Sequence, residues 1–232
     1  MVVRLIDDPS LDRRARAGLL GRLTVALAGS ARKAGAAAVG SGRWLTDTVE
    51  EFAPHVPIRD LATLRSHHDG LTGDALAKVL IEAAARATAA IGAAGGVVSS
   101  MEFTAPPLLL TSPVQVAAET LAVVTIELKL VAELHEVYGR AVVGTPAVRT
   151  AAYLGAWTRK RGLDRAGGTG LAGLVGGTAR RELRRRVMRR AGENVATVLP
   201  FMAGAVAGAS LNSRETRKLG ATIAKDLGGR VR

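Results

Sequence analysis

The sequence predicts an all-α protein, a compact bundle of about seven helices with a long central helix and close packing rich in alanine and glycine. Three observations support this. Apolar residues recur at helical spacing, caps and breakers mark helix ends, and no run of alternating apolar and polar residues is long enough for a sheet. Hydrophobic residues make up 48% of the 232 positions, which excludes an intrinsically disordered chain.

The first seventy residues predict two helices and a connector. Asp8 followed by Pro9 is an N-cap with proline at the first helical position. Five apolar residues then recur every four positions, as one stripe of an amphipathic helix: Leu11, Ala15, Leu19, Leu23 and Leu27. A short helix is expected over residues 44–52. Two prolines end it, and residues 54–73 are expected to be mostly connector.

The two longest helices are predicted in the middle of the chain. One covers about residues 74–95 and precedes the break at Pro106-Pro107. The other begins with Ser-Pro-Val-Gln at residues 112–115, a capping box with proline at the first helical position. It ends at Gly139, which suits the left-handed C-terminal position. A helix over residues 113–138 would span about 39 Å, so we expect it to be the central helix.

The C-terminal part predicts further helices, over about residues 146–162, 169–191, 195–211 and 212–228. The last of them begins with Asn-Ser-Arg-Glu, a second capping box. We divide the chain into an N-terminal helical and connector region, residues 1–70, and a helical domain, residues 71–232.

Glycine pairs spaced four apart indicate close helix packing. Three such pairs lie in predicted helices: Gly92 and Gly96, Gly173 and Gly177, and Gly204 and Gly208. Glycine inside a helix costs up to about 1 kcal/mol relative to alanine, and it is tolerated where two backbones must approach closely. We interpret these glycines as helix-packing positions, in a protein core or between membrane helices.

The charge of the chain is concentrated in one segment. The chain carries a net charge of +12, and residues 180–190, here called the basic segment, contribute +6. Seven arginines and only one glutamate lie in this segment: Arg180, Arg181, Arg184, Arg185, Arg186, Arg189 and Arg190. Because like charges at helical spacing repel one another, an anionic partner would stabilise such a helix.

Three readings of the basic segment remain open, two with a partner and one without. An anionic membrane surface is favoured, since each basic residue near it contributes about 1 kcal/mol. Nucleic acid is the alternative, because phosphates attract the same charges. However, the segment contains no aromatic residue for stacking on bases. A solvated surface without any partner is the third reading.

The sequence contains no recognisable catalytic motif. The absence of cysteine excludes disulfides, thiolate metal sites and a cysteine nucleophile, and neither a phosphate loop nor a nucleophile elbow is found. Glu127, Glu133 and His135 could form a carboxylate/His site, but Ala132 breaks the Glu-x-x-His spacing of di-metal bundles. We therefore expect no catalytic residue, no metal and no cofactor, and a helical enzyme using this carboxylate/His site is a less favoured alternative.

Two stretches of low charge raise the question of membrane insertion. Residues 87–118 contain only Glu102 as a charge, and residues 194–213 contain none, whereas a spanning helix needs about 20 apolar residues. Prolines interrupt both stretches, so we expect buried core helices and leave integral insertion open. Asp7 and Asp8 interrupt any signal-peptide core, so a cytoplasmic location is expected.

Three segments resemble the EcsC protein family. They are residues 106–110 (Pro-Pro-Leu-Leu-Leu), residues 134–139 (Leu-His-Glu-Val-Tyr-Gly), and residues 198–209 (Val-Leu-Pro-Phe-Met-Ala-Gly-Ala-Val-Ala-Gly-Ala) with Asn212 behind them. The resemblance covers roughly residues 72–228. The family is helical, and its namesake is encoded beside an ABC transporter. The resemblance therefore implies a membrane-linked, non-catalytic role.

Together these observations predict a bacterial, membrane-associated accessory protein. The basic segment would hold it on anionic lipid at the inner face of the cell membrane, where a membrane protein could be a further partner. A nucleic-acid-associated protein is the alternative. The oligomeric state is left open.

Overall fold

The computed structural model describes residues 5, 11–40, 43–102, 112–160 and 202–228. Within these residues the protein is all-α, as predicted, with eight α-helices, one short 3-10 helix and no strand. The elements are α2 (Arg13–Ala34), α3 (Ala36–Gly40), α4 (Arg43–Phe52), η1 (Ala53–His55), α5 (Leu61–Ser66), α6 (Gly73–Glu102), α7 (Ser112–Val137), α8 (Pro146–Lys160) and α11 (Met202–Gly228).

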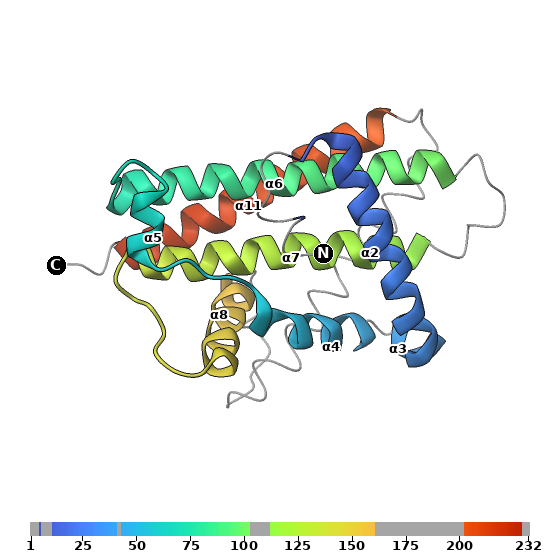
Figure 1. The fold of residues 1–232 in the computed structure, drawn as a ribbon, viewed down its shortest axis with the longest axis horizontal. Coiled ribbons are helices and arrows are strands. Elements are labelled where there is room, and N and C mark those ends of the chain that lie inside the picture. The colour runs from blue at the N-terminus through green and yellow to red at the C-terminus, as the bar shows by residue number, and fades with distance from the viewer. Residues whose placement is uncertain (1–4, 6–10, 41–42, 103–111, 161–201, 229–232) are drawn as a thin grey trace.

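Helix α7 is the centre of the bundle, which confirms the predicted long central helix. Helices α2, α4, α5, α6, α8 and α11 all pack against it. In Figure 1, α6 lies on one side of α7, α4 and α8 lie on the other, and α2 crosses both long helices. Every residue from 120 to 134 is buried. A helix enclosed in this way has no solvent face, so its polar side chains must find partners inside the protein.

The N-terminal region contains two α-helices more than the sequence predicts, α3 and α5, and a different cap. The N-cap of α2 is Asp12, whose Oδ1 accepts from the amide of Ala15 at 2.7 Å; Asp8 lies outside the described residues. The predicted stripe is wrong at Ala15, which is exposed. Helix α5 occupies part of the expected connector. Asp60 caps it by accepting from the amide of Thr63 at 2.8 Å.

The long helices differ from the prediction mainly at their ends. Helix α6 continues to Glu102, seven residues beyond the expected end. Helix α7 ends as predicted, because Gly139 adopts a φ of 63°, a conformation that glycine enters without steric cost. The second capping box is wrong: α11 runs unbroken through Asn212, and this side chain lies buried in the middle of the helix.

The core is one continuous hydrophobic cluster. It combines Leu20 and Trp44 from the N-terminal region with Leu130, Tyr153 and Leu219 from the rest of the chain. The division at residue 70 stays a prediction. Among the described residues, no helix is both long enough and apolar enough to cross a membrane.

Candidate functional site

The structure describes only part of the site residues that the sequence predicts. The seven arginines of the basic segment lie outside the described residues, as do Gly173 and Gly177. Gly96 lies in α6 and Gly204 in α11. The remaining predicted positions, Gly92 and Gly208, come together.

Gly92 and Gly208 mark a close approach of the backbones of α6 and α11. A Cβ atom built at Gly92 would lie 2.7 Å from the carbonyl carbon of Gly208 and 2.8 Å from Nδ2 of Asn212. In contrast, a Cβ at Gly208 would lie 3.5 Å from the nearest atom, the carbonyl oxygen of Gly92, which is an ordinary contact. The two glycines belong to different predicted pairs, and only Gly92 is sterically required.

A buried polar network follows this crossing into the core. Nδ2 of Asn212 donates to the carbonyl oxygen of Thr88 at 3.1 Å, and the hydroxyls of Thr88 and Thr216 are 3.0 Å apart. The Thr216 hydroxyl donates to Oε1 of Glu127 at 3.0 Å, and Nε1 of Trp157 donates to its Oε2 at 2.8 Å. The carboxylate of Glu127 therefore connects α7 to α8 and α11.

The two threonine hydroxyls each have one hydrogen to donate in this network. That of Thr216 points to Glu127. The hydroxyl of Thr88 has an acceptor of its own, the carbonyl oxygen of Ala85 at 3.1 Å, so its single hydrogen is divided between this carbonyl and the hydroxyl of Thr216. Glu127 is completely buried, and two donors reach its two oxygens, one at each. The network thus stabilises a buried carboxylate, as buried polar groups require.

A second buried carboxylate, Glu133, attaches the connector before α5 to α7. Arg59 donates to it through Nε at 2.7 Å and through Nη2 at 2.9 Å, a bidentate pair. Lys129, one turn earlier on α7, lies 2.9 Å from the same carboxylate and also donates to the carbonyl oxygen of Pro57 at 2.8 Å. This ion-pair network has a structural role.

The predicted carboxylate/His site does not assemble. Glu127 and Glu133 belong to the two separate networks above. His135 has Nδ1 2.7 Å from the carbonyl oxygen of Val131, and its ring packs edge-on against Tyr153 with centroids 5.2 Å apart. Burial lowers the pKa of His135, and Arg159 lowers it further. Across the described ranges, no three acidic or histidine side chains gather as a metal site would require.

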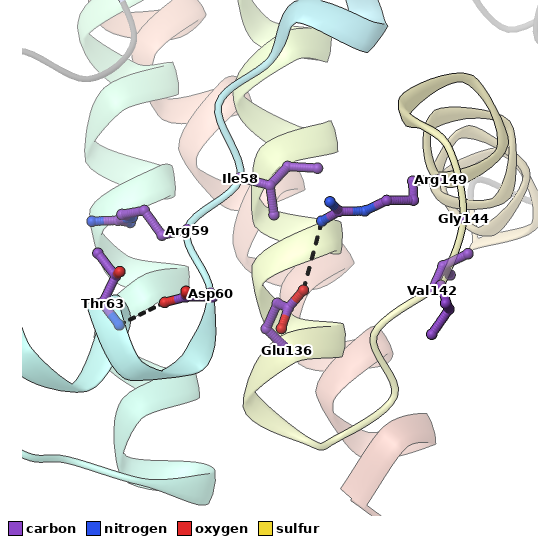
Figure 2. Close-up of a pocket in the computed structure, with 9 residues that line it drawn as sticks. Ile58, Arg59, Asp60, Thr63, Glu136, Val142, Gly144 and Arg149 are labelled. Carbon is purple, nitrogen blue, oxygen red and sulfur yellow. Dashed lines mark hydrogen bonds and ion pairs between the residues drawn. The ribbon is translucent and has the colours of Figure 1, made fainter.

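An open pocket of about 650 Å³ lies between the connector, the end of α7, the following loop and α8 (Figure 2). Its charged lining residues are Arg59, Asp60, Glu136 and Arg149. Figure 2 shows Arg149 reaching from α8 toward Glu136 on α7, where Nη2 lies 3.7 Å from Oε1. Asp60 is turned to the amide that it caps.

The electrostatics of this pocket are nearly balanced. Burial raises the pKa of Glu136, Arg149 opposes this shift, and Asp60 adds to it. Arg59 is already held by Glu133, so of the two arginines only Arg149 could engage an anionic ligand without breaking a bidentate pair. The pocket has two cations and two carboxylates and no histidine. Its two carboxylates are each engaged within the protein, Asp60 with the amide of Thr63 and Glu136 with Arg149.

Thr88, Trp157 and Thr216 were not singled out in the sequence, although each joins the central network. The sequence shows them only as polar side chains inside apolar helical stretches, and this pattern does not indicate which of them contact one another.

Comparison of the chain with known protein families, with curated proteins and with solved structures finds no match. The resemblance to the EcsC family therefore rests on the sequence motifs alone.

Proposed function

We propose that this chain is a non-catalytic accessory protein that binds anionic membrane surfaces peripherally, at the inner face of the cell membrane, through the basic segment. The observation that carries the proposal is the charge density of that segment: seven arginines and one glutamate in residues 180–190, half of the chain's excess of +12. Several basic residues near an anionic surface contribute about 1 kcal/mol each, and together they suffice for peripheral attachment.

The ion pairs of the described bundle support this proposal. Glu133 is paired with Lys129 and Arg59, and Glu136 faces Arg149. Further pairs join Glu82 to Arg217 and Asp226 to Lys160. These four carboxylates have cations of their own, so they are less available to neutralise the basic segment.

The catalytic alternative has weaker support. Its three residues, Glu127, Glu133 and His135, point into different environments, and the first two are almost fully enclosed. A substrate could not reach either carboxylate without opening the bundle. The EcsC resemblance favours an accessory role and a membrane-protein partner, and both remain part of the proposal.

Vesicle co-sedimentation of the full chain tests the proposal. The segment variant replaces Arg184, Arg185, Arg186, Arg189 and Arg190 with glutamine. A matched control removes the same charge from five exposed cations on four of the described helices: Arg43, Arg65, Lys78, Arg214 and Lys225. At about 1 kcal/mol per cation, the segment variant should bind anionic vesicles at least about 100-fold more weakly, and the control should lose much less.

Two results would overturn the proposal. One is equal vesicle binding by the wild-type chain and the segment variant. The other is tighter binding to DNA or RNA than to anionic vesicles, with a steep dependence on salt, which would instead favour the nucleic-acid alternative.

A further inference from the structure

Helix α2 has two sharply different faces. Its buried face consists of Arg16, Ala17, Leu20, Leu23, Thr24, Leu27 and Ala31, which pack across α6 and α7. The opposite face is exposed along the whole helix. The 22 residues of α2 contain no acidic side chain. All charged side chains on the exposed face of α2 are therefore cations.

Four exposed cations define the α2 cationic face: Arg14, Arg22, Arg32 and Lys33. The described structure gives none of them an ion pair or a side-chain hydrogen bond. Their side chains are therefore available to a partner. At the helical rise, the face extends for about 29 Å from Arg14 to Lys33.

The cations lie on both edges of the face. At about 100° per residue, Arg14 and Arg32 share one edge, and Arg22 and Lys33 lie about 80–100° away on the other. Gly18, Val25 and Gly29 occupy the strip between them, and Val25 is 75% exposed. A strip without polar side chains and with cations on both flanks suits the surface of an anionic bilayer, because the cations reach headgroup phosphates on either side and Val25 meets the interface.

We infer that the α2 cationic face is a second membrane-contact surface, and that its partner is the headgroup layer of an anionic bilayer. A second copy of the same face is excluded as a partner by repulsion between like cations. Nucleic acid fits less well, because the central strip of Gly18, Val25 and Gly29 offers no hydrogen-bonding side chain to bases.

This inference rests on the proposed function for the identity of the partner, but it concerns a different surface of the protein. The first experiment compares vesicle binding of two variants of the full chain. The α2 variant carries Arg14→Gln, Arg22→Gln, Arg32→Gln and Lys33→Gln. Its control has four exposed cations of other helices changed to glutamine, Arg65, Lys78, Arg214 and Lys225. All eight substitutions are on exposed helix positions, where glutamine is a good helix former.

The expected result is a loss of at least about tenfold in binding to phosphatidylcholine vesicles that contain phosphatidylserine, with a smaller loss for the control. Equal losses in the α2 variant and the control would overturn the inference. If the segment variant loses binding and the α2 variant does not, the inference fails and the proposed function stands. If only the α2 variant loses binding, the role of the basic segment fails and the inference stands.

A second experiment locates the contact independently of charge. Because the chain contains no cysteine, a Val25→Cys variant takes a polarity-sensitive fluorophore at one position only. Val143→Cys is the matched control: this side chain is 93% exposed and lies in the loop between α7 and α8, away from α2 (Figure 1). Anionic vesicles should shift the emission of the label at 25 to shorter wavelength and leave the label at 143 little changed.

The inference requires that anionic vesicles shift the emission of the fluorophore at position 25 more than that of the fluorophore at position 143. An equal or smaller response would overturn the inference, and so would a response to a DNA duplex that exceeds the response to vesicles. The latter result would assign the face to nucleic acid instead.

Discussion

Replacing Gly92 with alanine tests the close backbone contact between α6 and α11. The new Cβ would lie 2.7–2.8 Å from backbone atoms of Gly208 and from Nδ2 of Asn212. Backbone cannot turn aside as a flexible side chain can, so α6 and α11 would have to separate. The same movement would weaken the hydrogen bond from Asn212 to the carbonyl oxygen of Thr88.

The magnitude follows from three contributions. Overpacking in a core costs about 1–3 kcal/mol, and a weakened hydrogen bond adds up to about 1 kcal/mol. Alanine regains up to about 1 kcal/mol of helix propensity. The net loss in the free energy of unfolding for Gly92→Ala is therefore about 2 kcal/mol, which corresponds to a decrease of about 4–8 °C in Tm for a chain of this size.

Two other glycines provide controls that should behave differently. An added Cβ at Gly18, on the exposed face of α2, has no neighbour within 4 Å, so Gly18→Ala should raise Tm by about 2–4 °C through helix propensity. Gly208→Ala should leave Tm unchanged or raise it by up to about 2–4 °C, because its Cβ would meet nothing nearer than 3.5 Å and alanine is the better helix former. Thermal unfolding followed by circular dichroism measures all three. A Gly92→Ala variant as stable as the wild type would refute the close crossing of α6 and α11.

Three further predictions concern buried or half-buried polar groups. Thr216→Val removes a donor to Glu127 and should lower the free energy of unfolding by about 1–3 kcal/mol, measured by urea denaturation. Burial and the hydrogen bond to Asp74 raise the pKa of Tyr138 to about 12. The stability that this tyrosine contributes is thus present below pH 10 and is lost as pH rises to about 12. Its tyrosinate absorbance, recorded with the second tyrosine replaced by phenylalanine, should titrate near 12, and a midpoint near 10 would contradict the contact. Burial lowers the pKa of His135 below 6.5. The free energy of unfolding should therefore decrease as pH falls below 6.5, and His135→Gln should reduce this decrease.

The parts of the fold that the sequence predicts are those set by local chemistry. Gly139 ends α7 because the positive φ required there is a property of one residue. The start of α7 is marked by its own serine and proline. Helix α5, in contrast, has only six residues, which is too short for a periodic pattern to be read. The only local feature of the sequence that indicates α5 is Asp60, the residue that caps it.

The second capping box failed because a tertiary contact outweighs a local pattern. Asn212 could cap a helix only if the chain began a new one there. It lies inside α11 instead, and its amide reaches Thr88 on α6. The two residues are 124 positions apart, so no sequence window contains both. The same reason explains why glycine spacing indicated close packing but did not identify Gly92 and Gly208 as partners.

The cations of helix α2 fall into two groups, one that makes contacts within the fold and one that is exposed without them. Arg16 is buried, and it donates through Nη1 to the carbonyl oxygen of Leu5 at 2.8 Å, so this cation is used to hold Leu5 against α2. The four cations of the α2 cationic face have no such contact in the described structure. Folding therefore does not require them, and like charges on one helix oppose it slightly. These four cations are therefore available to an anionic partner, which is the basis of the second membrane-contact surface that we propose.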